Sequence, residues 1–439
     1  MIFFYRLFFI LLFLLSAPFY LRRKLRRDKN IRQWPQYLGF FPKLSGRDTG
    51  GTKKRIWIQA VSVGEVLAIG PLIKQLQQST DVEIILTTTT STGYKEAKKR
   101  YSDSTSGIGL FPMDFWACSA LAWSRIQPDV AILAESELWP EHLHQASKKG
   151  VPVFLINARL SDRSYSRLKR FNGLARFFIN KIQAIYCATK VDYERFSDLG
   201  AQPKNTIGNI KLDVDFGSEP SDSEKASQLK QLGFEYSSSE SNRPLTLIGA
   251  STWPGEETLL LKAQKYCIDS GIPCQLIIVP RHVERRGEIQ RLLNEQSLPW
   301  ASTSGDFGNR TLMDEGSQAI YLSDTTGQLT HSLKLADLAF IGKSMPPNVG
   351  GQTPIEAAAQ GIPILLGPNM SNFKTITEEL IESGAARCVT SQSELNEQVL
   401  QLAKDLQART QMKAAGMAWH EANKGIISEI GDAILQTLI

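Results

Sequence analysis

Acidic side chains stand at two places in the sequence where an apolar run ends. Glu65 lies in the segment VSVGEV, at the end of the run 55–61, and Glu135 lies in AESELWPEH, directly after the run Val130–Ala134. An ionised carboxylate can accept a proton from a hydroxyl group, so both residues are candidates for general base catalysis. Two structural interpretations stay open: Ser62 and Glu65 match a capping box, in which the glutamate bonds only to the backbone, and Glu135 could belong to a solvated loop.

Basic side chains follow other apolar runs in the same way. Lys211 lies in GNIKLD at the end of the first half of the chain, and Arg281 and His282 lie in VPRH, directly after the run 275–279. Adjacent cationic donors at the end of a strand suit a phosphate group. The alternative for Arg281 and His282 is a pair of surface charges.

The segment NVGGQTPIEAAAQG, residues 348–361, has the features of a helix start. We expect Thr353 as the N-cap, Pro354 at the first helical position and Glu356 at the third. The glycines before them are typical of a helix N-terminus that binds an anion, and Glu356 could accept hydrogen bonds from ribose hydroxyl groups. The alternative role of Glu356 is again that of a capping box.

The sequence gives no support for a resident metal ion or cofactor. It contains no P-loop and no H-E-x-x-H or G-x-S-x-G segment, and its five cysteines are scattered without a C-x-x-C pair. His142 and His144 have a spacing that suits no metal site, so we expect both at the surface.

The apolar runs alternate with amphipathic stretches of helical period, which predicts α/β domains with parallel sheets. Ligands of such sheets bind beyond the carboxyl ends of the strands. The polar stretch 216–244 is the expected linker between two doubly wound, Rossmann-like domains that face a cleft, 48–215 and 245–439, and the last helix could pack back on the first domain. The expected strands are 55–61, 82–86, 108–111, 130–134, 151–156, 184–188, 245–250, 275–279, 319–322, 337–341 and 362–366.

The amino terminus has the features of a membrane anchor. The first 21 residues are apolar except for Arg6, and as a helix they would span roughly 31 Å, close to the hydrocarbon thickness of a bilayer. Residues 22–32 carry seven lysines and arginines against one aspartate, which favours an uncleaved anchor over 1–32 with the rest of the chain in the cytoplasm. A cleaved signal peptide is the alternative.

The formal net charge of +6 resides entirely in that basic block, so the rest of the chain sums to zero. A nucleic-acid partner is therefore not indicated. With 42% hydrophobic and 21% charged residues, the composition is that of a globular protein and excludes a disordered chain.

Taken together and in order, these segments resemble the Kdo (3-deoxy-D-manno-octulosonic acid) transferases of lipopolysaccharide biosynthesis. The resemblance runs from about Trp57 to Phe373 and includes the anchor. The segments that carry it are IWIQAVSVGEV, ESELWP, NARLS, GNIKLD, ASTWPGEE, VPRH and GGQTPIEAAAQGIPILLGPNMSNF.

The resemblance implies a GT-B glycosyltransferase fold and transfer of Kdo, with inversion, from CMP-Kdo to a lipid A precursor (lipid IVA) at the cytoplasmic side of the inner membrane. It implies that Glu65 is the proton acceptor and that Glu135 and Lys211 assist the transition state. It assigns donor contacts to Arg281, His282, Gly327, Gln328, Leu329, Thr353, Pro354, Ile355 and Glu356.

The chain departs from the family pattern only on the donor side. It has Gln352 and Thr353 where the family usually has His and Asn, Gln328 in place of Glu, Lys343 where a glycine often follows Gly342, and Ala357 in place of Pro. Two alternatives stay open: another GT-B nucleotide-sugar enzyme, such as an epimerase or a different transferase, and a non-catalytic membrane-tethered relative.

Overall fold

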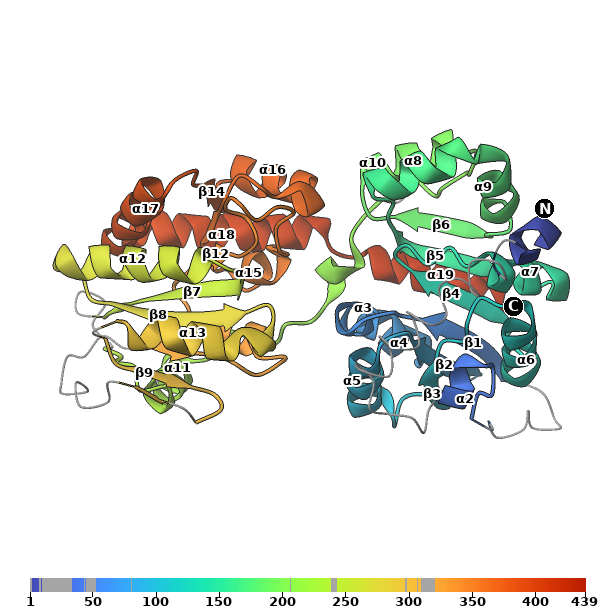
Figure 1. Cartoon of the computed structure of the whole chain (residues 1–439), viewed down its shortest axis with the longest axis horizontal. Helices are drawn as coiled ribbons and strands as arrows, with labels where there is room; N and C mark the ends of the chain where they lie inside the picture. Colours follow the sequence, from blue (N-terminus) through green and yellow to red (C-terminus); the bar gives the residue numbers. More distant parts are fainter. Residues whose placement is uncertain are drawn as a thin grey trace. The chain divides into compact units, whose positions relative to one another are not determined.

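The structure, a computed structural model, describes residues 2–7, 9, 34–42, 44, 53–79, 81–205, 207–237, 243–296, 298–305, 307–308 and 320–439. The chain forms two compact units (Figure 1). The first unit contains residues 1–215 and 424–439, and the second contains residues 216–423. Each unit is an α/β domain, which confirms the α/β class expected from the sequence.

The first unit is built on a six-stranded sheet in the order β3-β2-β1-β4-β5-β6, and all its strand pairs are parallel. The strand order reverses between the neighbours β1 and β4, and in open α/β sheets this switch point is where ligands bind. The strands are β1 Lys54–Gln59, β2 Val82–Thr88, β3 Gly107–Leu110, β4 Val130–Ala134, β5 Val153–Ala158 and β6 Ala184–Cys187.

Helices cover both faces of this sheet, because the buried strands need apolar partners on each side. One buried apolar cluster joins the sheet to α3, α4 and α19, and a second joins it to α6, α7 and α9. The helices are α2 Trp34–Tyr37, α3 Val63–Ala68, α4 Gly70–Leu76, α5 Ser91–Tyr101, α6 Trp116–Ile126, α7 Pro140–Lys149, α8 Asp162–Arg170, α9 Asn172–Ile179, α10 Lys190–Asp198, the 3₁₀ turn η2 Ile210–Asp213 and α19 Ile426–Thr437.

The second unit has an eight-stranded sheet in the order β10-β9-β11-β8-β7-β12-β13-β14. Only the β9–β10 pair is antiparallel among the described strands. The order reverses between β7 and β12, which makes a second switch point. The strands are β7 Leu245–Thr252, β8 Cys274–Pro280, β9 Trp300–Ser302, β10 Phe307–Gly308, β11 Ile320–Leu322, β12 Leu338–Ile341, β13 Ile364–Leu366 and β14 Ala386–Cys388.

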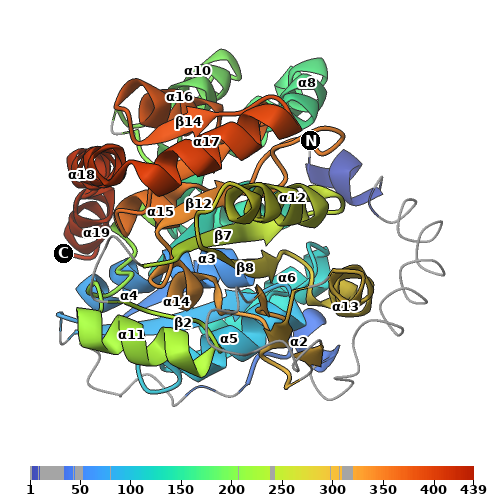
Figure 2. The ribbon, with the colours of Figure 1, turned by 90° about the vertical axis from the view of Figure 1, so that its left-hand side faces the viewer.

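The helices of the second unit include a long pair, α12 and α17, that packs side by side over the sheet (Figure 2). Their apolar side chains join the core formed by the strands. The helices are α11 Asp222–Gln231, α12 Glu256–Asp269, η4 Val283–Arg285, α13 Arg286–Asn294, α14 Leu329–Leu333, α15 Ile355–Ala359, η6 Ser371–Phe373, α16 Lys374–Glu382, α17 Gln392–Lys404 and α18 Leu406–Asn423.

The stretch 216–244, expected as a linker, is instead part of the second unit. It contains α11, which begins with a full capping box between Ser221 and Glu224. Leu229 is buried, and Lys225 forms an ion pair of 3.0 Å with Asp337 beside the start of β12. The last helix, α19, belongs to the first unit, where it packs against α4 and η2 (Figure 1).

The first residues of the chain pack on the first unit. Residues 2–7 are helical, and the Arg6 guanidinium donates two hydrogen bonds, of 2.8 and 2.9 Å, to the buried carboxylate of Glu141 at the start of α7. Most of the anchor expected over 1–32 lies outside the described residues. Among the helices that the structure describes, none has the length and apolar character needed to cross a membrane.

Candidate active site

Four residues at strand ends have left-handed backbone conformations, which side chains other than glycine rarely adopt. They are Glu135 after β4, Asn157 near the end of β5, Ser251 near the end of β7 and Lys343 after β12, with φ angles of 60°, 51°, 60° and 61°. These positions lie at or next to the two switch points. Strained backbone of this kind clusters at functional sites, so both sheets have a candidate site at the same edge.

In the first unit, Glu65 lies at the start of α3, directly beyond β1. Its carboxylate accepts hydrogen bonds from the backbone N–H of Val61 at 2.8 Å and from the Ser62 hydroxyl at 3.0 Å. The Ser62 side chain makes no capping bond in return, so the reciprocal capping box is incomplete. Glu65 therefore makes contacts that are typical of a helix start. Its position beyond the carboxyl end of β1 also suits a catalytic base.

The environment of Glu65 makes it a stronger proton acceptor than an exposed carboxylate. Glu65 is only 7% exposed to solvent. Burial and, second, the charge of Glu135 raise the pKa of Glu65, while its two hydrogen bonds and the charge of Lys211 oppose that shift. A carboxylate with a raised pKa is a stronger base once it is ionised.

Glu135 and Lys211 lie together at the same sheet edge. The Lys211 ammonium, in η2, is 3.4 Å from Oε1 of Glu135, and the Asn157 amide lies 3.4 Å from the same oxygen. Asn209 begins η2 by accepting a hydrogen bond from the Lys211 backbone N–H. The structure therefore brings Glu65, Glu135 and Lys211, which lie on three separate loops, into one cluster.

A third carboxylate, Glu137, completes this cluster. In the sequence it follows the same apolar run as Glu135, but the resemblance assigned a role to Glu135 alone of the two. It accepts a hydrogen bond of 2.5 Å from the Trp139 indole and a second one from the Gln59 side chain. Burial, together with the charges of Glu65 and Glu135, raises its pKa to about 7. Glu137 is therefore close to half-protonated at neutral pH.

Gln59 connects this cluster to the interior of the first unit. Its amide oxygen accepts from the Thr87 hydroxyl at 2.7 Å and its amide nitrogen donates to Thr89 at 2.9 Å. The Trp57 indole in turn donates to Thr87 at 2.9 Å. A buried polar chain thus fixes the amide that bonds to Glu137.

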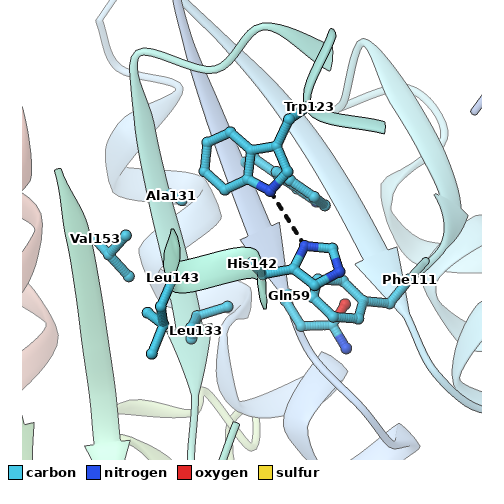
Figure 3. A pocket seen from close by; sticks show the side chains of 9 residues that line it. Gln59, Phe111, Trp123, Ala131, Leu133, His142, Leu143 and Val153 are labelled. Atoms are coloured by element: carbon cyan, nitrogen blue, oxygen red, sulfur yellow. Dashed lines mark hydrogen bonds between the residues drawn. The ribbon is translucent and has the colours of Figure 1, made fainter. Parts of the chain in front are cut away.

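Behind Gln59 is a small pocket whose lining is otherwise aromatic and aliphatic (Figure 3). In it, Nδ1 of His142 accepts from the Trp123 indole at 3.2 Å and Nε2 lies 3.2 Å from the carbonyl oxygen of Pro112. Burial lowers the pKa of His142 to about 4, so the ring is neutral. The expectation of a surface histidine was wrong for His142, because its ring is needed to pair two buried polar groups.

In the second unit, Arg281 and His282 follow β8 and are both exposed, as expected for residues that could meet a ligand. The His282 ring packs edge-on against Trp253, with ring centroids 5.3 Å apart. Trp253 follows β7, the strand next to β8 in the sheet. Arg281 and His282 are therefore near the second switch point.

The other predicted donor residues come from two segments that the structure joins. The Thr330 hydroxyl, at the start of α14 after Gly327–Leu329, donates to the Glu356 carboxylate at 3.0 Å. Glu356 therefore makes a contact between two helices. Ile355 is buried, so its side chain belongs to the core.

The helix start predicted at Thr353 is wrong by one position. The N-cap is Pro354, and α15 begins at Ile355 and has only five residues. The backbone N–H groups of Gly350, Gly351 and Gln352 donate to carbonyl oxygens of Asn369, Lys343 and Gly342. These amides hold the loop to β12, so they are not available to an anion as the sequence had suggested.

Within the described part of the chain, no group of three or more His, Cys, Asp or Glu side chains could hold a metal ion. The chemistry that the first site supports is acid–base chemistry on a hydroxyl group, with a lysine close by. The second site contains the basic side chains of Arg281 and His282 and the aromatic ring of Trp253.

Comparison with known proteins identifies the family. The domain family described as 3-deoxy-D-manno-octulosonic-acid transferase (kdotransferase) matches residues 32–214. The 3-deoxy-D-manno-octulosonic acid transferase of Haemophilus influenzae is 31% identical over 384 residues, which are 86% of each chain. This chain belongs to the Kdo transferase family. It is therefore a glycosyltransferase, and the resemblance found in the sequence is confirmed.

Solved structures of lower identity agree on the fold. The UDP-GlcNAc 2-epimerase of Neisseria meningitidis, solved with UDP-GlcNAc, aligns with a TM-score of 0.57 at 14% identity and covers 88% of this chain and 99% of its own. Acinetobacter baumannii MurG aligns with a TM-score of 0.52 at 12% identity, covering 87% and 99%. These neighbours have the GT-B glycosyltransferase fold, and at such identity they show the fold alone.

Proposed function

We propose that this Kdo transferase moves Kdo from CMP-Kdo to a hydroxyl group of a lipid A precursor (lipid IVA), with inversion at the anomeric carbon. The observation that carries the proposal is the cluster of Glu65, Glu135 and Lys211 at the switch point of the first sheet. The family membership supplies the donor and the acceptor.

Glu65 is the proton acceptor in this proposal. It removes the proton of the acceptor hydroxyl as that oxygen attacks the anomeric carbon of Kdo, and the bond from that carbon to the CMP phosphate breaks. General base catalysis of this kind contributes roughly 10²–10⁴-fold to a rate. Burial raises the pKa of Glu65, which makes its carboxylate a stronger base.

Lys211 and Glu135 assist the same step. The Lys211 ammonium lies beside the Glu135 carboxylate and its charge lowers the pKa of Glu65, so it helps keep the base ionised. In the second unit, Arg281 and His282 take up the negative charge of the departing CMP, with Gly327, Gln328, Leu329 and Thr353 to Glu356 as further donor contacts. The donor is bound by the second unit and the acceptor by the first.

The amino terminus has a role in reaching the acceptor. A lipid acceptor lies in a bilayer, and an anchor over 1–32 raises its local concentration at the enzyme. The basic residues of 22–32 favour anionic headgroups by about 1 kcal/mol per charge near the surface. In this proposal the enzyme acts at the cytoplasmic side of the inner membrane.

The direct test is an assay of CMP release with purified CMP-Kdo and a lipid A precursor. We expect CMP and a glycolipid that carries Kdo in equal amounts, and an anomeric configuration in the product opposite to that of the donor. Turnover of a UDP-sugar without any use of CMP-Kdo would overturn the proposal in favour of another nucleotide-sugar enzyme.

A further inference from the structure

Lys343 occupies a backbone position that a glycine would adopt without strain. It follows β12, at the switch point of the second sheet beside the end of β7, and its φ angle is 61°. The left-handed region is costly for a residue with a Cβ atom and free for glycine. The family that the sequence resembles often has a glycine at this position.

The backbone around Lys343 is fixed by its neighbours and cannot relax. Its N–H donates to the buried carboxylate of Glu256 at 2.8 Å, and its carbonyl accepts from Gly351 at 3.0 Å. A Cβ on the preceding Gly342 would lie 2.2 Å from the carbonyl oxygen of Ser251, so the two strand ends are packed together without space. The strain at Lys343 is therefore built into the site.

The Lys343 side chain lies over an aromatic ring without a counter-ion. Its ammonium is 4.5 Å from the centroid of the Trp253 ring, and no carboxylate of the described residues forms an ion pair with it. The ring of His282 packs on the edge of the same Trp253. The Trp253 indole nitrogen is buried and has no hydrogen-bond partner in the described part of the chain.

The contact between the ammonium of the half-buried Lys343 and the Trp253 ring is favourable but weak. It does not offset the free-energy cost of the strained backbone at Lys343. The lysine therefore has a use other than stability. An unpaired cation at a switch point, held in place by an aromatic face, is suited to bind an anionic ligand group.

We propose that Lys343 binds an anionic group of the donor and is a determinant of donor affinity in this chain. This rests on the proposed function, which supplies a donor with two candidate groups, the phosphate of CMP and the carboxylate of Kdo. Trp253 positions the ammonium, and His282 stands beside the same ring.

The test compares the wild-type chain with Lys343→Gly and Lys343→Arg by titration calorimetry with CMP and with CMP-Kdo. For Lys343→Gly we expect the Kd for CMP-Kdo to rise about tenfold or more, without a lower melting temperature, because glycine relieves the strain. Lys343→Arg should restore most of the affinity. A loss for CMP-Kdo alone assigns the contact to the carboxylate, and an equal loss for CMP assigns it to the phosphate.

Two control variants separate strain and charge from binding. Gln127→Gly relieves another left-handed position, φ 50°, in the first unit, and Lys265→Gln removes an exposed charge on α12. Both should bind CMP-Kdo as the wild-type chain does. If Lys343→Gly also binds both ligands unchanged, the inference is wrong while the proposed function stands. If Lys343→Gly weakens binding but the wild-type chain transfers no Kdo, the proposed function is wrong and the inference stands.

Discussion

At the scale of single residues, three glutamates share one sheet edge and differ in their surroundings. Glu65 is bonded to the start of α3, Glu135 lies beside Lys211, and Glu137 is held by Trp139 and Gln59. Close carboxylates cannot all ionise at low cost, so one of them retains its proton to a higher pH. Glu137 is that residue, with a pKa raised to about 7 by burial first.

The pKa of Glu137 predicts how stability depends on pH. The folded state binds this proton more tightly than the unfolded state, so wild-type stability should fall as the pH rises from about 4.5 to about 7. Glu137→Gln, which keeps the acceptor for Trp139, should lack this fall and become the more stable protein by up to about 3 kcal/mol at pH 8. Melting temperatures of both proteins from pH 5 to pH 8 measure the difference.

The control for that experiment is Glu288→Gln on α13, because the hydrogen bond from Arg285 lowers the pKa of this exposed carboxyl and keeps it ionised. The gap between this variant and the wild-type chain should not change over the same pH range. A gap between Glu137→Gln and the wild-type chain that is equally constant would contradict the raised pKa.

The sequence predicted the residues of the first site but not how they are held. Glu65 and Glu135 could be selected because each follows an apolar run, and Lys211 because the family resemblance assigned it a role. Glu137 also follows such a run, but nothing in the residue types indicates its burial beside like charges, nor the left-handed backbone of Asn157 and Lys343. Such conformations are set by the packing of neighbouring strands and override local preference.

At the scale of elements, every strand that was predicted from an apolar run is present, while the short strands β9, β10 and β14 were missed. Their sequences, WAS, FG and ARC, contain no apolar run of the kind that predicted the other strands. The apolar period of residues 66–78 predicts one helix, but the structure has two, α3 and α4, because Gly70 and Pro71 start a new helix after Ile69.

Helix α7 gives a prediction at this scale. Its first turn contains Glu141, whose side chain is fully buried and paired with Arg6. Replacing Arg6 by Met leaves that carboxylate buried with only Gln145 as a partner, and should cost about 2 kcal/mol. Arg100→Met removes an arginine from the exposed pair with Glu96 and should cost less than about 0.5 kcal/mol. Denaturant unfolding of the two variants checks this, and equal losses would contradict the role given to Arg6.

At the scale of the whole molecule, the two units repeat one arrangement. Each has a parallel sheet with a switch point, and each has strained residues at the carboxyl ends of its strands. The family and the GT-B fold could be predicted from the order of short segments along the chain. The predicted end of the first domain at residue 215 coincides with the division between the units. That 216–244 belongs to the second unit could not be predicted, because its polar composition conceals a capped helix that pairs with Asp337, beside β12, through Lys225.

The proposed membrane anchor gives a prediction from the charge distribution. Replacing the seven lysines and arginines of 22–32 by glutamine lowers the formal net charge from +6 to −1 and leaves Arg6 in place. Transfer to acceptor in vesicles that contain anionic lipid should fall at least tenfold, and transfer to acceptor dispersed in neutral detergent should not change. An equal loss in both assays would mean that this block serves the fold and not the bilayer.

The measurement that tests the central claim most directly is the transfer rate of Glu65→Gln. Glutamine keeps the size of the side chain and an oxygen that can accept from Val61, but it cannot take a proton from the acceptor. We predict that CMP release from CMP-Kdo falls at least about 100-fold, while the Kd for CMP stays within error of wild type and the melting temperature is not lowered, and that Glu96→Gln retains full activity. A Glu65→Gln enzyme that transfers Kdo within a few-fold of the wild-type rate would show that this carboxylate only caps α3.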